Sequence, residues 1–191
     1  MRFFPLLACL LTADGVGAIS VSRRRVASLV VAMRGGAGGA ITEDEVAAAQ
    51  QAWSNDLVEI GAAYSSGGDY KGLAKASLDR NYGYASGMAV LFKPTKAANP
   101  AIRLTEAEAV SYFIGGDVPE DKGFALAPFT AVRWDNKGTI CDSDSATAMG
   151  EYFFTDATGG VTKAEYTFEY RRADDGHLRI VVHHSSLPYS A

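Results

Sequence analysis

Residues 162–172 alternate strictly between polar and apolar side chains, and this pattern restricts the C-terminal half of the chain to a sheet with one buried face. Successive side chains of a strand point to opposite faces, so the apolar set packs on a core. The turn sequence Asp174-Asp175-Gly176 and a further strand follow, which predicts an antiparallel hairpin. The polar set is Lys163, Glu165, Thr167, Glu169 and Arg171, and the apolar set is Ala164, Tyr166, Phe168 and Tyr170.

Three helices are predicted ahead of this sheet, two of them from capping boxes. Thr42 with Glu45, and Thr105 with Glu108, each place an N-cap hydroxyl three residues before a glutamate. The first box begins a long helix that ends at the Ser-Ser-Gly-Gly sequence of residues 65–68. The second begins a short helix through residue 114, and a further helix is predicted over about residues 69–81.

Strands are predicted at residues 88–92, 124–134, 139–155 and 178–188, with a turn at residues 136–138. The stretch 139–155 is either one long strand or two strands broken near Asp144. Helices followed by an antiparallel meander are typical of the α+β fold class. We therefore expect N-terminal helices packed on a curved antiparallel sheet, forming a cone with a pocket inside.

Residues 1–40 have the composition of a targeting segment rather than of a folded domain. Arg2 and a short apolar run precede small residues at 15–18, as in a signal peptide, and the run is too short to span a bilayer. Residues 20–34 are rich in Ser and Arg and hold no acidic residue, as in a transit peptide. We expect residues 1–40 to be disordered and to direct the protein to a plastid; simple secretion into the endomembrane system is the alternative. Residues 41–191 form the mature domain, for which we expect no membrane association.

The net charge argues against a nucleic-acid-binding protein, and the cysteine content argues against an internal disulfide in the mature domain. The formal net charge of −4 gives no basic surface for nucleic acid. Of two cysteines, Cys9 lies in the targeting segment, so Cys141 is left without a disulfide partner.

The last predicted strand ends in an unusual polar sequence, His183-His184-Ser185-Ser186. Alternation places His183 with Ser185 on one face and Ile180 with His184 and Ser186 on the other, and the residue types do not decide which face is inward. The same spacing argues against a site made of all three histidines, because His177 lies about 20 Å along the strand from His183. One histidine with carboxylates stays open as a metal site.

Several motifs of the mature domain together resemble the iota-class carbonic anhydrases, which are related to the association domain of calcium/calmodulin-dependent protein kinase II. The resemblance covers about residues 43–189. One departure is Val182, where many members have a further histidine. The motifs are Gln51-Ala52-Trp53, Gly83-Tyr84, Val90-Leu91-Phe92-Lys93-Pro94-Thr95, Ser111-Tyr112-Phe113-Ile114-Gly115-Gly116-Asp117, Gly123-Phe124-Ala125-Leu126, Ala148-Met149-Gly150-Glu151-Tyr152-Phe153-Phe154, Glu165-Tyr166-Thr167-Phe168 and His183-His184-Ser185-Ser186-Leu187-Pro188.

The resemblance implies a homodimeric, cone-shaped barrel of the NTF2-like type that hydrates CO₂ reversibly to bicarbonate. It implies activity without a metal, with Mn²⁺ or Zn²⁺ as the alternative. Carried over onto this sequence, the pocket residues of the family are Thr95, Tyr112, His183 and Ser185. His184 and Ser186 are secondary candidates, since the inward face of the strand is open.

These residues suggest how a metal-free site would act. Thr95, Tyr112 and Ser185 would hold the attacking water, and His183 would orient Ser185 or relay the proton. The apolar wall would come from Tyr152, Tyr166 and Phe168. The alternatives are a non-catalytic association or ligand-binding module, and an isomerase using Asp117 or Glu151 as the base.

Overall fold

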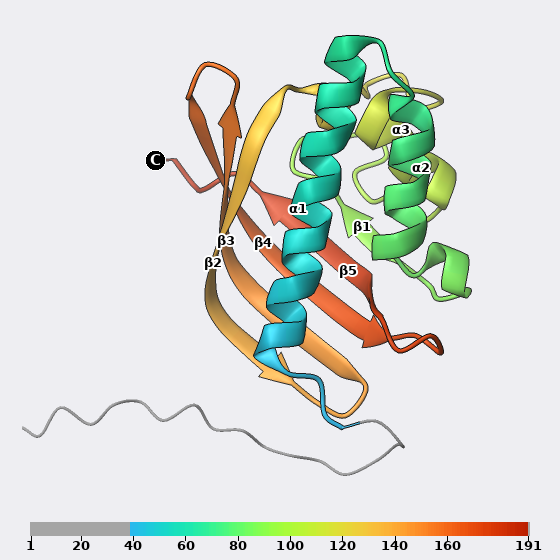
Figure 1. The fold of residues 1–191 in the computed structure, drawn as a ribbon, viewed down its shortest axis with the longest axis vertical. Coiled ribbons are helices and arrows are strands. Elements are labelled where there is room, and N and C mark those ends of the chain that lie inside the picture. Colours follow the sequence, from blue (N-terminus) through green and yellow to red (C-terminus); the bar gives the residue numbers. More distant parts are fainter. Residues whose placement is uncertain (1–38, 191) are drawn as a thin grey trace, which may run out of the picture.

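The computed structural model describes residues 39–190, in which helices cover one face of a five-stranded sheet (Figure 1). The predicted targeting segment lies outside these residues, apart from Gly39 and Ala40. No helix among residues 39–190 is long and apolar enough to cross a membrane. The elements are α1 (Glu43–Ser66), α2 (Tyr70–Asn81), η1 (Tyr84–Ser86), β1 (Leu91–Lys93), α3 (Glu106–Ile114), η2 (Phe124–Leu126), β2 (Phe129–Cys141), β3 (Ser145–Asp156), β4 (Val161–Arg172) and β5 (Leu178–Ser186).

The sheet has the strand order β1-β5-β4-β3-β2. Strands β2 to β5 form the predicted antiparallel meander, and β1 adds to β5 in parallel. Figure 1 shows α1 lying along the concave side of the curved sheet, with α2 and α3 beside it. The predicted α+β cone is confirmed, and its interior lies between α1 and the sheet.

Both predicted capping boxes are present and begin α1 and α3. The α1 helix ends at Gly67, whose φ of 75° is the left-handed conformation that glycine adopts without a Cβ clash. Asp69 caps α2 through the backbone N–H of Gly72, so this helix also lies where it was predicted. Buried side chains of α1, among them Trp53, Leu57 and Ile60, point into the cone.

The sequence prediction for residues 124–138 was wrong at two places. Residues 124–126 form the η2 turn, and the strand begins only at Phe129, beyond Pro128. Residues 136–138 are not a turn but an irregularity within β2, whose register against β3 shifts between Asn136 and Gly138. Gly150 of β3 permits this bulge, because a Cβ there would lie 2.2 Å from the backbone oxygen of Asp135. The chain reverses instead at residues 142–144, the break near Asp144 that was left open.

A second irregularity, in β5, decides which residues face the interior. Phe168 pairs with His183 but Tyr170 pairs with Ile180, so β5 holds one more residue than β4 over this stretch. The extra residue reverses the alternation, and Ile180 shares the buried face with His183 and Ser185. The face assignment from simple alternation, which grouped Ile180 with His184, was therefore wrong. Val182 pairs with Glu169 on the outer face, away from the interior.

Candidate active site

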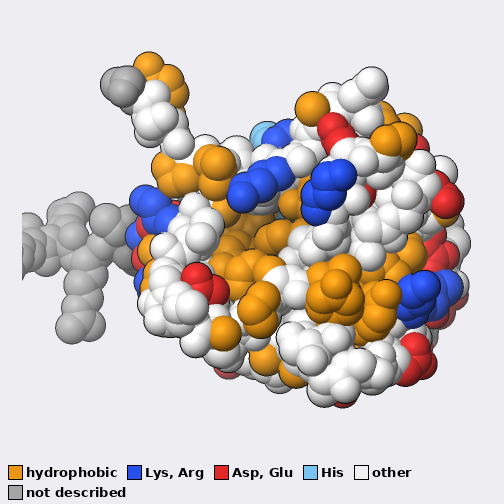
Figure 2. Space-filling view, turned by 90° about the horizontal axis from the view of Figure 1, so that it is seen from above, with side chains coloured by type: hydrophobic (Ala, Val, Ile, Leu, Met, Phe, Trp, Pro, Cys, Tyr) orange, Lys and Arg blue, Asp and Glu red, His pale blue; other side chains and the backbone are white. Residues whose placement is uncertain are grey.

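The interior of the cone holds a cavity of about 360 Å³ and, behind it, a void of about 10 Å³. Both are lined by Thr95, Tyr112 and Phe124, so these residues lie where the two spaces meet. We call them the outer chamber and the inner void. A space of this smaller size holds about one water molecule. Figure 2 shows an apolar hollow bordered by basic side chains on the end of the molecule seen from above.

Two side-chain hydroxyl groups from other parts of the chain contact the hydroxyl group of Ser185. The Oγ of Ser185 is hydrogen-bonded to Thr95 Oγ1, from the loop after β1, and accepts a hydrogen bond from the hydroxyl of Tyr152 in β3. Ser185 and Tyr152 are buried, whereas Thr95 is half-buried and borders both chambers. Burial raises the pKa of Tyr152, which therefore stays protonated and can donate at neutral pH. We call Thr95, Tyr152 and Ser185 the hydroxyl cluster.

Tyr112 brings a further hydroxyl to the junction of the two chambers. Its ring stacks on Phe124, with 5.5 Å between the centroids, and lies edge-on to Phe92 at 5.6 Å. Burial raises the pKa of Tyr112 to about 12, and the neighbouring Lys96 backbone and Thr95 side chain oppose this rise. The phenol is thus also a neutral donor at physiological pH.

His183 lines the inner void, and a hydrogen-bonded chain of two aromatic side chains, Tyr82 and Trp53, contacts its ring nitrogen Nδ1. Its Nδ1 lies 2.8 Å from the hydroxyl of Tyr82, and the Nε1 of Trp53 donates to that hydroxyl at 3.1 Å. An indole N–H can only donate, so the Tyr82 hydroxyl accepts from Trp53. Tyr82 is fully buried, and Nδ1 of His183 is the acceptor that the described hydrogen bonds leave for its hydrogen. The Nε2 of His183 therefore carries the proton. Burial also lowers the pKa of His183 well below its usual value, with a smaller contribution from His184, so the ring is neutral.

The two predicted roles of His183 do not fit this geometry. The described hydrogen bonds of its ring lead to Tyr82 and not to Ser185, so His183 does not orient that hydroxyl. A ring whose pKa is lowered by burial also takes up a proton poorly. What the geometry offers instead is a fixed Nε2–H donor for a ligand in the inner void.

The secondary candidates His184 and Ser186 lie on the opposite face of β5, outside the cone. They border a shallow outer groove together with Lys137 and Glu151. Of the six candidate site residues, the structure therefore brings four together in the cone: Thr95, Tyr112, His183 and Ser185. It separates His184 and Ser186 from them.

The predicted walls and bases require correction as well. Tyr152 belongs to the hydroxyl cluster, and Tyr166 and Phe168 line neither chamber; the outer chamber is walled by Phe124, Phe129 and Phe154. Glu151 pairs with Lys163 on the outer face of the sheet, and Asp117 borders a separate groove near Lys75. Neither base proposed for an isomerase lies at the cavity. Within residues 39–190, no group of three or more His, Cys, Asp or Glu side chains is placed to hold a metal ion.

Sequence reasoning missed Tyr82 and the hydroxyl role of Tyr152. Both hydrogen bonds join residues far apart in the chain, so no local spacing marks them. The only signal was indirect: an aromatic residue with a hydroxyl group at an inward position has to satisfy that group once it is buried.

Replacement of Tyr82 by phenylalanine should change the tautomer of His183 without altering the fold. The variant removes the donor to Nδ1, so the proton is no longer restricted to Nε2. Nitrogen-15 NMR of the imidazole should show one neutral tautomer in the wild type and a mixture in the variant. Tyr84→Phe is the matched control, because the neighbouring Tyr84 hydroxyl is buried with no partner among the described residues. A tautomer unchanged in Tyr82→Phe would contradict the assignment.

Stability should fall as the pH is lowered through the range in which histidine normally titrates. The pKa of His183 is lowered by burial in the folded protein from the ordinary histidine value of about 6.5, so between the two pKa values the unfolded chain binds one proton more. The contribution of this residue is complete above about pH 6.5 and decreases below it, by at most about 1.4 kcal/mol per pH unit. Urea unfolding of the wild type and of His183→Gln should show a pH slope between pH 5 and 7 that is smaller in the variant. Equal slopes would contradict the burial of a neutral ring.

The fold and the cavity define an α+β cone with a hydroxyl-lined interior. Residues 44–187 match the model of a family described as metal-independent carbonic anhydrase, and the chain belongs to that family. It is 46% identical over 155 residues to the metal-independent carbonic anhydrase of Nostoc sp. strain PCC 7120, an alignment that covers 78% of this chain and 75% of that protein.

Solved structures agree with this assignment. The crystal structure of a cyanobacterial iota-carbonic anhydrase complexed with bicarbonate superposes with a TM-score of 0.78 at 42% identity, covering 83% of this chain and 100% of the other. A protein from Xanthomonas campestris described as a calcium/calmodulin dependent protein kinase II association domain superposes with a TM-score of 0.51 at 23% identity, over 77% of this chain and 88% of its own. The second likeness concerns the fold alone.

Proposed function

We propose that this protein is a carbonic anhydrase that interconverts CO₂ and bicarbonate. The observation that carries the proposal is the hydroxyl cluster at the inner end of an apolar cavity, where Ser185 joins Thr95 and Tyr152. Membership of the metal-independent carbonic anhydrase family supports it, as does the bicarbonate complex of a relative with the same fold.

The reaction adds water to the carbon atom of CO₂ and releases a proton. CO₂ is small and apolar, which suits entry through the phenylalanine-walled outer chamber. Free water has a pKa of about 15.7, so the site has to favour the bicarbonate charge as it develops. Neutral hydroxyl donors that are fixed in place do this without reorganising. Thr95 and Tyr112, which line the inner void, are placed for it, and Ser185 holds Thr95 in position.

The neighbouring residues would hold these donors in place. Tyr152 donates to Ser185, which leaves the hydrogen of Ser185 for Thr95 and the hydrogen of Thr95 for the reacting oxygen. The Nε2–H of His183 would be a further donor in the inner void. The proton would pass to water in the outer chamber and from there to buffer. The proposed site needs no cofactor, in keeping with the family to which the chain belongs.

Exchange of ¹⁸O between labelled CO₂ and water, followed by mass spectrometry, tests the activity directly. We expect the purified protein to accelerate loss of the label from CO₂ far above the buffer rate. No acceleration would contradict the proposal and would favour the non-catalytic ligand-binding module.

We also propose that the protein is a homodimer formed through the outer face of the sheet. Four large apolar side chains on that face are at least half exposed: Leu91 (53%), Ile140 (75%), Met149 (57%) and Val161 (61%). Their burial in a dimer interface would remove this apolar surface from water. Size-exclusion chromatography coupled to light scattering should give a molar mass of twice that of the chain for the wild type. The Met149→Glu variant should give the mass of a single chain.

For localisation we propose delivery to a plastid. The support is the composition of residues 1–40, in which a signal-like apolar run precedes a Ser- and Arg-rich stretch without acidic residues. A fluorescent protein fused behind residues 1–40 should enter the plastid of an alga whose plastid is bounded by extra membranes. Its secretion would contradict the proposal.

A further inference from the structure

The outer chamber is much larger than the proposed substrate. Bicarbonate has four non-hydrogen atoms, whereas the chamber has a volume of about 360 Å³. This volume lies within the range of about 300–1,000 Å³ that is usual for pockets binding larger organic molecules. The inner void holds about one water molecule, and bicarbonate placed at the junction beside Thr95 and Tyr112 would fill only a small part of the outer chamber. The outer chamber therefore has room for a second kind of ligand.

The walls of the outer chamber are aromatic. The rings of Phe124, Phe129 and Phe154 contact one another pairwise, with centroid distances of 5.4 Å, 5.3 Å and 5.4 Å. Phe124 and Phe129 are only partly buried, so apolar surface faces the chamber. A ligand with an aromatic ring would extend this cluster at the ring distances that such clusters prefer.

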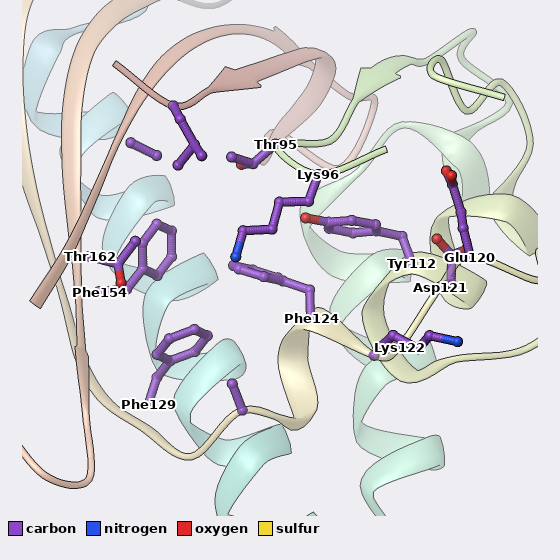
Figure 3. Close-up of a pocket in the computed structure, with 14 residues that line it drawn as sticks. Thr95, Lys96, Tyr112, Glu120, Asp121, Lys122, Phe124, Phe129, Phe154 and Thr162 are labelled. Carbon is purple, nitrogen blue, oxygen red and sulfur yellow. The ribbon is translucent and has the colours of Figure 1, made fainter. Parts of the chain in front are cut away.

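Two cationic side chains line the chamber, Lys96 and Lys122, and neither has a counter-ion among residues 39–190. Figure 3 shows Lys96 extending across the chamber toward Phe124, whereas Lys122 points away from the phenylalanines. Within residues 39–190, the Lys96 ammonium group makes no ion pair or hydrogen bond. An ammonium group beside apolar walls attracts an anion more strongly than one in open water.

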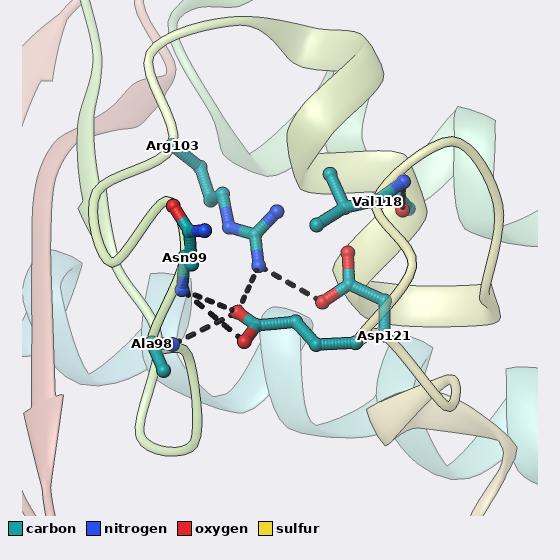
Figure 4. A network of polar contacts seen from close by, with 7 residues as sticks. Ala98, Asn99, Arg103, Val118 and Asp121 are labelled. Carbon is teal, nitrogen blue, oxygen red and sulfur yellow. Dashed lines mark hydrogen bonds and ion pairs between the residues drawn. The ribbon is translucent and has the colours of Figure 1, made fainter.

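The two carboxylates that line the same chamber are already occupied. Arg103 donates to Glu120 at 2.9 Å and to Asp121 at 3.0 Å, and Glu120 also accepts from the backbone of Ala98 and Asn99 (Figure 4). Lys96, Lys122 and Arg103 thus face only two carboxylates at this end of the cone. The balance of charge is positive and suits a monoanion.

We propose that the outer chamber binds a small aromatic monocarboxylate, the class to which benzoate belongs. Its carboxylate would pair with Lys96, and its ring would pack against Phe124, Phe129 and Phe154. Because the outer chamber leads to Thr95 and Tyr112, an occupant closes the path to the inner void. Benzoate in the outer chamber should therefore inhibit CO₂ hydration. This expected inhibition rests on the proposed function, whereas the binding of benzoate does not.

Isothermal titration calorimetry with sodium benzoate tests the binding. We expect a single site with a Kd below about 1 mM. Benzamide keeps the ring and loses the charge, and acetate keeps the charge and loses the ring; each should bind at least about tenfold more weakly. Lys96→Met should weaken benzoate by about tenfold, and the matched control Lys122→Met should change it less than about twofold.

Several outcomes would overturn the proposal: no benzoate binding, equal binding of benzamide, or equal effects of the two lysine variants. The ¹⁸O exchange assay, run with and without benzoate, separates this proposal from the carbonic anhydrase function. Benzoate binding to a protein without exchange activity would overturn the function and retain the binding site. Exchange activity that benzoate does not inhibit, in a protein that binds no benzoate, would retain the function and overturn the binding site.

Discussion

Replacement of Ser185 by alanine is expected to lower kcat/KM for CO₂ hydration by about 10²- to 10³-fold, because Thr95 loses the partner that fixes it as a donor to the developing charge, and losing one fixed donor usually costs this much. Ser185 is the only residue that hydrogen-bonds both Thr95 and Tyr152 in the described chain. Its loss frees both hydroxyls to turn away from the inner void. The change removes one oxygen atom at a buried position and creates no large cavity, so the fold should persist.

The matched control for this variant is Ser186→Ala. Ser186 is the next residue of β5 but faces the outer groove beside His184, so its loss should leave the rate within about twofold of the wild type. Stopped-flow measurement of CO₂ hydration compares the two variants. Equal rates for both would exclude the hydroxyl cluster from the reaction.

The second large effect is expected on stability. Arg103→Met should lower the free energy of unfolding by about 3–5 kcal/mol, the cost of removing one partner from a buried ion pair. The Arg103 side chain is fully buried, and the side chain of its partner Asp121 is 1% exposed, so the variant leaves a carboxylate uncompensated. Arg103 also pairs by its backbone with Phe92, and Glu120 binds the loop at Ala98 and Asn99. The loop that carries Thr95 is thus closed at its ends by the pair of Phe92 and Arg103 and held at its middle by Glu120.

Arg80→Met serves as the control for Arg103. Arg80 pairs with Asp56 at 2.8 Å, but its side chain is 56% exposed, and exposed pairs contribute about 0–1 kcal/mol. Urea unfolding should therefore separate the two variants clearly. A loss of less than about 1 kcal/mol in Arg103→Met would contradict a structural role for the buried pair of Arg103 and Asp121.

The sequence predicted the parts of the fold that depend on local chemistry. The capping boxes at Thr42 and Thr105 place a donor and an acceptor three residues apart, so the helix starts could be read directly. The alternation in β4 appears in the structure with Ala164 to Tyr170 buried at every second position. These features need no knowledge of the neighbouring strands.

The errors came from bulges, which depend on a neighbouring strand. The extra residue of β5 opposes β4, and the bulge of β2 fits over Gly150 of β3. Neither partner is evident from the local pattern, so simple alternation assigned Ile180 to the wrong face. The parallel pairing of β1 with β5 brings together Phe92 and His183, which lie far apart in the sequence, so local patterns do not show this pairing either.

The candidate site was predictable in part for the same reason. His183 and Ser185 could be paired by their spacing, and Thr95 and Tyr112 entered through the resemblance to a family. The inward face of β5 depends on its bulge, and the hydrogen bond from Tyr82 to His183 depends on packing between distant segments.

Stopped-flow CO₂ hydration after treatment with a chelator tests the central claim most directly, which is that fixed hydroxyl groups carry the reaction. The protein should be dialysed against the chelator, its metal content measured by mass spectrometry, and the wild type compared with Ser185→Ala. We predict full activity in metal-stripped wild type and a loss of at least about 100-fold in Ser185→Ala. Activity that disappears with the chelator and returns with Mn²⁺ or Zn²⁺ would contradict the claim.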